Sequence, residues 1–293
     1  MPYAPADDDV KLYYEEAGQG PAVIFVHELA GDHRSWEPQI RELARGFRCI
    51  AYNARGYPPS DVPANPAQYS QARAADDIAS VLRHLGIERA HVVGLSMGGF
   101  ATLHFGLRHA ESAKSLVVAG CGHGAEPATR EAFRADCAAS AARIESEGMG
   151  PFARRYGVSA TRLRFRTKNP GAWQEFAERL AGHSPQGTAN TLRGVQMARP
   201  SLWDLVADME RLAIPTLIVT GDEDDPCLEA GLLMKRAIAR SGLVVFPQSG
   251  HTINLEEPEL FNRMVADFLR GVEEGRWEAR DPNSRIGGLM GAR

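Results

Sequence analysis

The sequence lacks the features of secreted, membrane-spanning and nucleic-acid-binding proteins. Only 4 of its 293 residues are cysteines, and they form no C-x-x-C pair, which argues against a disulfide framework or a cysteine-based metal site. No apolar run is long enough to span a bilayer, and no basic-then-apolar leader comes before the aspartates at 7–9. A formal net charge of −4 without a basic stripe leaves nothing to neutralise nucleic-acid phosphates. We therefore expect a reduced, cytoplasmic chain that binds neither membranes nor nucleic acid.

The sequence does contain enough apolar residues for a large core, because 44% of the chain is hydrophobic and 24% is charged. The stretch 22–27 is continuously apolar, which is typical of a parallel strand covered on both faces. Other strands are predicted at 10–16, 47–52, 91–93, 115–119, 216–220 and 243–246, and helices at 34–45, 69–85, 100–109 and 258–269. This alternation predicts an α/β fold with a mostly parallel central sheet and helices on both faces.

The alternation of strands and helices stops after Gly120. Residues 122–209 contain helical stretches at 132–147, 172–180 and 188–198 but no strongly buried strand. We interpret 122–209 as a helical cap, or lid, inserted after the strand that follows the 100–109 helix. The predicted core then comprises 1–121 and 210–273, and 274–293 is predicted to be a flexible tail.

One short segment carries the main chemical signal. Gly94-Leu95-Ser96-Met97-Gly98 directly follows the β-branched run at 91–93 and precedes a helix-compatible stretch. A G-x-S-x-G sequence between a strand and a helix is a nucleophile elbow, in which a strained turn raises the serine hydroxyl above the sheet. Small residues on either side keep the neighbouring backbone from colliding. This context predicts that Ser96 is a nucleophile.

A nucleophilic serine needs a base, and the base needs an acidic partner that fixes its tautomer. In this topology the acid and then the histidine follow the serine, each on a loop after a strand. The loop 221–226 follows the 216–220 strand and offers three aspartates, namely Asp222, Asp224 and Asp225. His251 follows the 243–246 strand. The residues therefore predict a Ser-Asp-His set in the required order.

With these motifs the chain resembles the α/β-hydrolase superfamily, specifically its cap-bearing, cofactor-free serine members with a G-x-S-M-G-G elbow. The resemblance extends from about Val10 to Leu269 and is weakest in the cap. It implies that the acid stands fourth in a G-x-x-D loop before a proline, which corresponds to Asp224, with Asp222 and Asp225 as alternatives. The late S-G-H of the family is matched at 249–251. The implied catalytic residues are Ser96, Asp224 and His251.

An oxyanion hole requires two backbone N–H donors. Met97, just after the nucleophile at the positive end of a helix, is expected to supply one. By resemblance the second comes from the loop after the first buried strand, where relatives carry H-G-x, and this implies Leu29. Glu28 replaces that glycine, which restricts the backbone and brings a carboxylate close to the site. His27 is expected to brace this loop.

Further residues are candidates for the substrate pocket. Cys121 and His123 follow a buried strand and are expected at the pocket mouth, and Glu28 would lie beside them. Trp173 and Trp203 in the cap could line an acyl or leaving-group pocket, although aromatic residues at helical spacing more often belong to a core.

Five cap arginines are interpreted as a solvated face, with the alternative that one of them holds an anionic substrate group. They are Arg154, Arg155, Arg162, Arg164 and Arg166.

The predicted activity is hydrolysis of a small to medium carboxylic ester or lactone through an acyl-enzyme, with no cofactor and no metal. The partner is a small-molecule substrate, and the chain is expected to be a monomer or homodimer. Carbon–carbon bond hydrolysis and cofactor-free perhydrolysis use the same three side chains and remain alternatives. A small-molecule receptor on a hydrolase scaffold is the alternative from another class.

Overall fold

The structure is a computed structural model that describes residues 2–284, and it contains an eight-stranded sheet in the order β1-β2-β4-β3-β5-β6-β7-β8. β1 and β2 pair antiparallel, as do β2 and β4, and all other neighbours pair parallel. The strands are β1 Tyr3–Pro5, β2 Lys11–Ala17, β3 Ala22–Val26, β4 Arg48–Tyr52, β5 Ala90–Leu95, β6 Ala113–Ala119, β7 Thr216–Gly221 and β8 Ser241–Phe246. The prediction of a mostly parallel sheet is confirmed.

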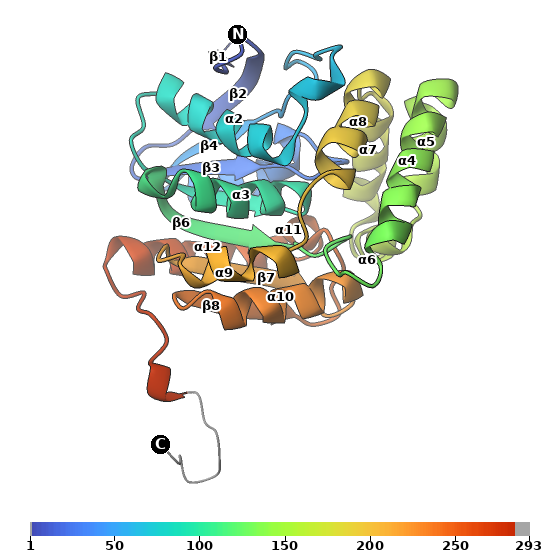
Figure 1. Ribbon diagram of the computed structural model, residues 1–293. Coiled ribbons are helices and arrows are strands. Elements are labelled where there is room, and N and C mark those ends of the chain that lie inside the picture. The colour runs from blue at the N-terminus through green and yellow to red at the C-terminus, as the bar shows by residue number, and fades with distance from the viewer. Residues whose placement is uncertain (1, 285–293) are drawn as a thin grey trace.

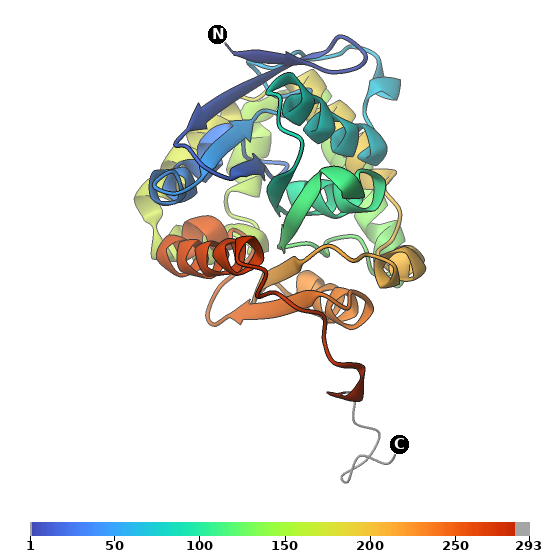
Figure 2. The same cartoon turned by 90° about the vertical axis from the view of Figure 1, so that its left-hand side faces the viewer.

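Helices cover both faces of the sheet (Figure 2). One face carries α1 (Glu37–Leu43) and α12 (Pro258–Glu273), and the other carries α2 (Gln71–His84), α3 (Met97–Arg108), α9 (Val206–Glu210) and α10 (Asp225–Ala237). Val23 and Phe25 of β3 pack on the α1 and α12 side, whereas Ile24 packs on the other. Because successive strand residues point to opposite faces, a strand buried on both must be apolar throughout, as β3 is.

A group of helices that we call the helical insertion, residues 130–197, separates β6 from β7. In Figure 1 these helices lie together on the side toward which the β6 arrow points, which is the carboxyl end of the parallel strands. The helices are α4 Arg130–Glu147, α5 Met149–Tyr156, α6 Ala160–Lys168, α7 Pro170–Ala181 and α8 Pro185–Thr191, followed by a π-helical turn, Leu192–Met197. Sequence patterning missed α5 and α6, because the many arginines in 154–166 obscure their apolar positions.

Several short elements complete the chain. α11 (Ile253–Glu256) precedes α12, and none of the helices within residues 2–284 is long and apolar enough to cross a membrane. Short 3₁₀ turns lie at His33–Trp36, Pro66–Gln68, Ala110–Ser112, Trp203–Leu205 and Pro282–Ser284. The sequence did not predict β1, whose three residues are too few for a periodic pattern.

The segment predicted as a flexible tail, 274–293, contacts the core in its first part. The Trp277 ring packs edge-on against Phe268 with centroids 4.6 Å apart, and its indole N–H donates to the Arg240 carbonyl at 2.8 Å. The part around Trp277 thus packs on the core, because an aromatic ring with a polar edge gains both burial and a hydrogen bond there. Residues 285–293 of the predicted tail lie outside the described residues.

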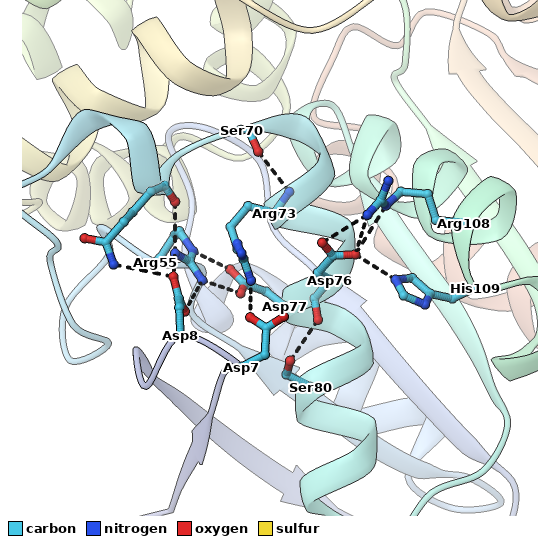
Figure 3. A network of polar contacts seen from close by, with 11 residues as sticks. Asp7, Asp8, Arg55, Ser70, Arg73, Asp76, Asp77, Ser80, Arg108 and His109 are labelled. Carbon is cyan, nitrogen blue, oxygen red and sulfur yellow. Dashed lines mark hydrogen bonds and ion pairs between the residues drawn. The ribbon is translucent and has the colours of Figure 1, made fainter.

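A buried network around Arg55 fixes the loop after β4 (Figure 3). The Arg55 guanidinium donates to both carboxylate oxygens of Asp77 on α2, at 2.7 and 2.6 Å, and to Asp8 in the β1–β2 turn at 2.9 Å. Both Arg55 and Asp77 are almost fully buried. Charges removed from water are tolerated only when they are paired and hydrogen-bonded, so this loop is held firmly in place.

We expect Asp77→Ala to lower the free energy of unfolding by about 3 kcal/mol, since it leaves the buried Arg55 charge only partly compensated. Asp76 is a matched control, because it lies next in sequence but pairs at the surface with Arg108 and His109 (Figure 3). Asp76→Ala should cost less than about 1 kcal/mol. Urea denaturation curves of both variants test this, and equal losses would contradict it.

Candidate active site

Ser96 lies between β5 and α3 in a strained backbone conformation. Its φ of 56° and ψ of −114° fall where side chains are rarely found. The surrounding hydrogen bonds hold it there, since its N–H donates to the Ala119 carbonyl at 2.8 Å and its carbonyl accepts from Phe100 N–H at 2.9 Å. The turn directs the hydroxyl to the carboxyl edge of the sheet, as a strand–turn–helix elbow requires.

The glycines on either side of Ser96 are required by close backbone approach. A β-carbon on Gly94 would lie 2.1 Å from the Gly98 carbonyl oxygen, and one on Gly98 would lie 2.0 Å from the Val26 carbonyl oxygen. Both distances are far inside van der Waals contact. Any larger residue at either position would therefore force the elbow apart.

Ser96, His251 and Asp224 lie in one hydrogen-bonded chain, although they are far apart in sequence. His251 Nε2 is 2.8 Å from Ser96 Oγ, and His251 Nδ1 is 2.7 Å from Asp224 Oδ2. Asp224 precedes α10 after β7, and His251 follows β8. Parallel strands end at the same edge of the sheet, so the loops that follow them meet there.

Asp224 and His251 alter each other's pKa. Burial would raise the pKa of Asp224, but the charge and hydrogen bond of His251 outweigh it and the pKa is lowered. Burial would likewise lower the pKa of His251, but the Asp224 charge outweighs it and the pKa is raised. The arrangement therefore favours an ionised carboxylate beside an imidazole that accepts a proton readily.

The other two aspartates of this loop do not contact the imidazole. Asp222 is exposed, and its Oδ1 accepts from the Ser249 N–H at 3.0 Å. Hydrogen bonds from the backbone of Gln248 and Ser249 lower its pKa. Asp225 is exposed at the start of α10. Of the three candidate acids, Asp224 alone is bonded to His251 within the part of the chain that the structure describes.

Glu256 holds the histidine loop, a role that the sequence did not indicate. Its carboxylate accepts from the Gly250 N–H at 2.6 Å and from the Thr252 N–H at 2.9 Å. These two backbone groups flank His251, and Glu256 is itself buried. The fixed acceptor therefore sets the backbone from which the imidazole projects. The sequence signal that could have pointed to Glu256 is an acidic residue five positions after His251.

Leu29 lies in a loop whose backbone is fixed from two sides. His27 Nε2 accepts from Ala54 N–H at 3.0 Å, so the ring proton is on Nδ1, which donates to the Glu28 carbonyl at 2.7 Å. Burial lowers the pKa of His27 to about 4, which keeps the ring neutral. The Tyr57 hydroxyl donates to the Leu29 carbonyl at 2.8 Å. In a trans peptide N–H and C=O point in opposite directions, so the Leu29 N–H points away from His27.

Met97, the other residue predicted to line an oxyanion hole, is the first residue of α3. Its N–H lies at the helix end that carries partial positive charge. The Met97 and Leu29 side chains share one apolar cluster with Phe152, Phe165 and Leu192 of the helical insertion. The insertion thus covers the edge of the sheet where Ser96 lies.

Glu28 has an unexpected partner in the helical insertion. Its carboxylate is bonded to the guanidinium of Arg162 on α6, and the two side chains are 1% and 0% exposed. The interpretation of the cap arginines as a solvated face is therefore wrong for Arg162. A buried carboxylate beside the site needed a buried cation, and only the folded chain reveals which arginine supplies it.

Cys121 and His123 follow β6, and His123 lies beside the loop that carries His251. The His123 ring centroid is 5.7 Å from that of His251. Burial, and then the neighbouring His251, lowers the pKa of His123 to about 4. Cys121 is buried, and burial raises the pKa of its thiol to about 12, so it is an unreactive thiol.

The two predicted pocket tryptophans have other packing partners. The Trp173 indole N–H donates to the Gly157 carbonyl at 2.7 Å inside the helical insertion, and Arg166 lies over the ring. Trp203 packs with the core cluster on the α2 and α3 side of the sheet. Both positions agree with the packing alternative that the sequence left open.

Asp224, Cys227 and His251 also form the group of possible metal ligands in residues 2–284, with ligand atoms within 4.8 Å of one another. The Cys227 thiol lies close to the Asp224 carboxylate, and burial raises the pKa of this thiol far above the usual range. A metal would have to break the bond between Asp224 and His251 and deprotonate this thiol. These residues fit a hydrogen-bonded chain better than a metal site.

Cavities lie beside this site and also far from it. A cleft of about 110 Å³ separates the loop at Gly31 from Phe165 and Phe176 of the helical insertion. A larger open groove of about 900 Å³ lies at the amino ends of β5, β6 and β7, lined by Arg89 and Lys114 among others. That groove is at the end of the sheet opposite the Ser96 hydroxyl, so it takes no part in chemistry there.

The fold and the Ser96 site define a known class of enzyme. Residues 21–258 match the family model described as the alpha/beta hydrolase fold. The chain belongs to this family and is an α/β-hydrolase.

Individual relatives are hydrolases of esters, lactones and related compounds. The chain is 30% identical over 259 residues to 3-oxoadipate enol-lactonase 1 of Acinetobacter baylyi, covering 86% of this chain and 90% of that protein. It is 29% identical to 2-hydroxy-6-oxo-6-phenylhexa-2,4-dienoate hydrolase of Comamonas testosteroni, covering 89% and 92%. A thermophilic esterase from Thermogutta terrifontis superposes with a TM-score of 0.81 at 26% identity, covering 92% of this chain and 98% of that one. These names support hydrolysis of esters and lactones in general.

Proposed function

We propose that this protein is a serine hydrolase that cleaves a small to medium carboxylic ester or lactone through an acyl-enzyme. The observation that carries the proposal is the unbroken hydrogen-bonded chain from Ser96 through His251 to Asp224. Its geometry provides a nucleophile, a base within reach of the nucleophile's proton, and an acid that orients the base.

In the first step Ser96 Oγ attacks the substrate carbonyl carbon, and its proton passes to His251 Nε2. The carbonyl π electrons move to oxygen, and the Leu29 and Met97 N–H groups stabilise that negative charge. Asp224 stabilises the imidazolium and stays ionised. The tetrahedral intermediate then collapses, the C–O bond to the leaving alcohol breaks, and His251 Nε2 donates its proton to that alcohol.

In the second step water releases the acyl group by the same route. His251 Nε2 takes a proton from water, the resulting hydroxide attacks the acyl carbon, and a second oxyanion forms in the same hole. Ser96 leaves with the proton from His251, which regenerates the free enzyme. A lactone follows the identical sequence, but its alcohol remains attached to the released acid.

The choice of ester or lactone rests on the relatives and on the apolar cover of the site. An enol-lactonase and an esterase are among the similar proteins, and a lactone is a cyclic ester. We propose that the helical insertion acts as a lid over Ser96, because Phe152, Phe165 and Leu192 pack against Leu29 and Met97. An apolar lid favours an acyl chain of limited size.

Carbon–carbon bond hydrolysis is a second candidate, favoured by the 29% identity to the 2-hydroxy-6-oxo-6-phenylhexa-2,4-dienoate hydrolase. The same serine, histidine and aspartate could serve it. The two candidates differ in the leaving group, which is a carbanion equivalent in one and an alcohol in the other.

A substrate panel tests the proposal. Purified protein is assayed with p-nitrophenyl acetate and butyrate, a series of lactones and a β-diketone, and is labelled with a fluorophosphonate. We expect turnover of esters or lactones and covalent labelling at Ser96. Turnover of the diketone alone would favour the carbon–carbon hydrolase, and ligand-dependent thermal stabilisation without turnover would favour a receptor.

The pH dependence of kcat/KM tests the role of His251. The imidazole must be neutral to accept the Ser96 proton, so activity falls as the pH drops through its pKa. Asp224 raises that pKa, so we expect the acid limb to lie above the ordinary histidine value of about 6.5. The measurement needs an ester whose leaving group does not titrate in this range. A limb below the ordinary value would contradict the pairing with Asp224.

A further inference from the structure

Helix α6 of the insertion carries three positively charged side chains, and each pairs with a glutamate on a different loop near Ser96. The loops are the one after β3, the one after β7, and the one that carries His251 into α12. The pairs are Arg162 with Glu28, Arg164 with Glu223, and Lys168 with Glu257. A single helix therefore contacts the oxyanion loop, the acid loop and the histidine loop.

Of these three pairs, the one between Arg162 and Glu28 is fully buried. The side chains of Arg164 and Glu223 are 38% and 39% exposed, and those of Lys168 and Glu257 are 22% and 34% exposed. Water and salt weaken pairs with such exposure. The buried pair consequently dominates the link between α6 and the catalytic loops.

Arg162 has several contacts within the insertion and one contact, with Glu28, toward the core. Its guanidinium lies over the rings of Tyr156 and Phe176, at 4.8 and 5.1 Å, and Nη2 also donates to the Tyr156 hydroxyl at 3.1 Å. Nη1 donates to the Thr161 carbonyl at 3.1 Å. Toward the core, Nη2 contacts one oxygen of Glu28.

The contact between Arg162 and Glu28 is not bidentate. Arg162 Nε and Glu28 Oε1 are both buried and have no hydrogen-bond partner in the described part of the chain. A bidentate pair would use both carboxylate oxygens and would be the stronger arrangement. A single contact suits a link that forms when the insertion docks and separates when it moves away.

Glu28 connects Arg162 to the loop that carries the Leu29 N–H. Its backbone carbonyl is already fixed by His27, and the same peptide unit carries the Leu29 N–H. His27 holds that peptide unit at its carbonyl, and the contact with Arg162 restrains the same residue through its side chain. Loss of Arg162 removes the second of these restraints on the donor assigned to the oxyanion hole. A glycine at this position could not connect to the insertion in this way.

We propose that Arg162 is a positioning residue that, through Glu28, aligns the Leu29 N–H with Ser96 while the helical insertion is docked. The inference rests on the proposed function, because it concerns the oxyanion hole of that reaction. It couples closure of the proposed lid to completion of the catalytic site.

The pH profile reports the charges of Arg162 and Glu28, whereas kcat measured above the acid limb, compared with KM, reports the alignment of the oxyanion donor. The charged and titratable groups around His251 are Asp224 on the acid loop, His123 after β6, Glu28 on the oxyanion loop and Arg162 on α6. Arg162 opposes protonation of His251 and Glu28 favours it. Loss of Arg162 should therefore move the acid limb of kcat/KM to higher pH, and loss of Glu28 should move it to lower pH.

The experiment uses Arg162→Met, Glu28→Gln and the double variant, with p-nitrophenyl butyrate for kcat, an ester whose leaving group does not titrate in this range for the pH profile, and fluorophosphonate titration to count active sites. We expect kcat per active site to fall about 10- to 100-fold in Arg162→Met, less than the full loss of one oxyanion donor, with KM changed much less. The double variant removes both buried charges, so no unpaired buried charge is left to destabilise its fold. Its kcat should nevertheless be as low as that of Arg162→Met, with an acid limb near that of the wild type.

The matched control is Arg155→Met, because within residues 2–284 Arg155 pairs with Glu147 inside the insertion and not with the loops that hold Glu28, Glu223 or Glu257. Its kcat should stay at the wild-type value. Wild-type kcat per active site in the double variant would overturn the inference. A fold-loss of kcat in the double variant equal to the product of the two single-variant losses would also overturn it, because it would show no coupling between the residues.

The failure of this inference is distinguishable from failure of the proposed function. A wild-type protein that neither hydrolyses esters or lactones nor reacts with fluorophosphonate would overturn both. Active, labelled wild-type protein together with an Arg162→Met variant of unchanged kcat would overturn the positioning role alone.

Discussion

Replacing Ser96 with alanine should lower kcat for p-nitrophenyl butyrate by about 10⁴- to 10⁶-fold, because no acyl-enzyme can form without its hydroxyl. The residual rate would come from binding and from the N–H groups of Leu29 and Met97. The effect should be purely chemical, since the alanine keeps the backbone hydrogen bonds of the elbow. Steady-state kinetics, with circular dichroism to verify folding, measure it.

Ser146 provides the matched control for this substitution. It is an exposed serine on α4 whose hydroxyl bonds to carbonyls of its own helix. Ser146→Ala should leave kcat unchanged. Retention of more than about a tenth of the wild-type kcat in Ser96→Ala would show that another group attacks the substrate, and the proposed mechanism would fail.

Asp224→Asn should lower kcat by about 10⁴-fold. The asparagine amide nearly preserves the shape of the carboxylate, but it carries no charge to stabilise the imidazolium. Its NH₂ group can also donate to His251 Nδ1, which would leave the ring proton on Nε2, where the Ser96 proton must go. The substitution thus removes the base without removing its side chain.

Asp222 is the control on the same loop, two residues earlier. Its carboxylate accepts from the Ser249 N–H, and an asparagine keeps an acceptor oxygen for that bond. Asp222→Asn should change kcat by no more than about twofold. The reverse pattern, with Asp222→Asn inactive and Asp224→Asn active, would overturn the assignment of the acid.

The fold was predictable from sequence where burial imposes a pattern on consecutive residues. β3 is apolar throughout because both of its faces are covered, so the run could be read directly. α12 was equally clear from its amphipathic spacing. α6 was not, because arginines such as Arg162 occupy positions that an apolar pattern would need. Their burial depends on partners elsewhere in the chain.

The same distinction applies to the site. The elbow around Ser96 was predictable because it needs local features, namely a strand, two glycines and a helix in direct succession. Glu256 was not, because its role depends on two N–H groups that the fold of α11 brings to its carboxylate. The acid was an intermediate case, because one loop holds three aspartates and the resemblance to a G-x-x-D loop favoured Asp224, which is the one that contacts His251.

The order and spacing of residues by themselves determined the strand–helix alternation and, through the resemblance of the motifs, the family. They also predicted the nucleophile and the base, because each of these features depends on a few neighbouring positions. Tertiary structure alone decided that Arg162 meets Glu28. A pairing between 28 and 162 joins segments separated by more than a hundred residues, and no local pattern constrains it. Such contacts are fixed by the energetic need to pair charges removed from water, which arises only once the chain has folded.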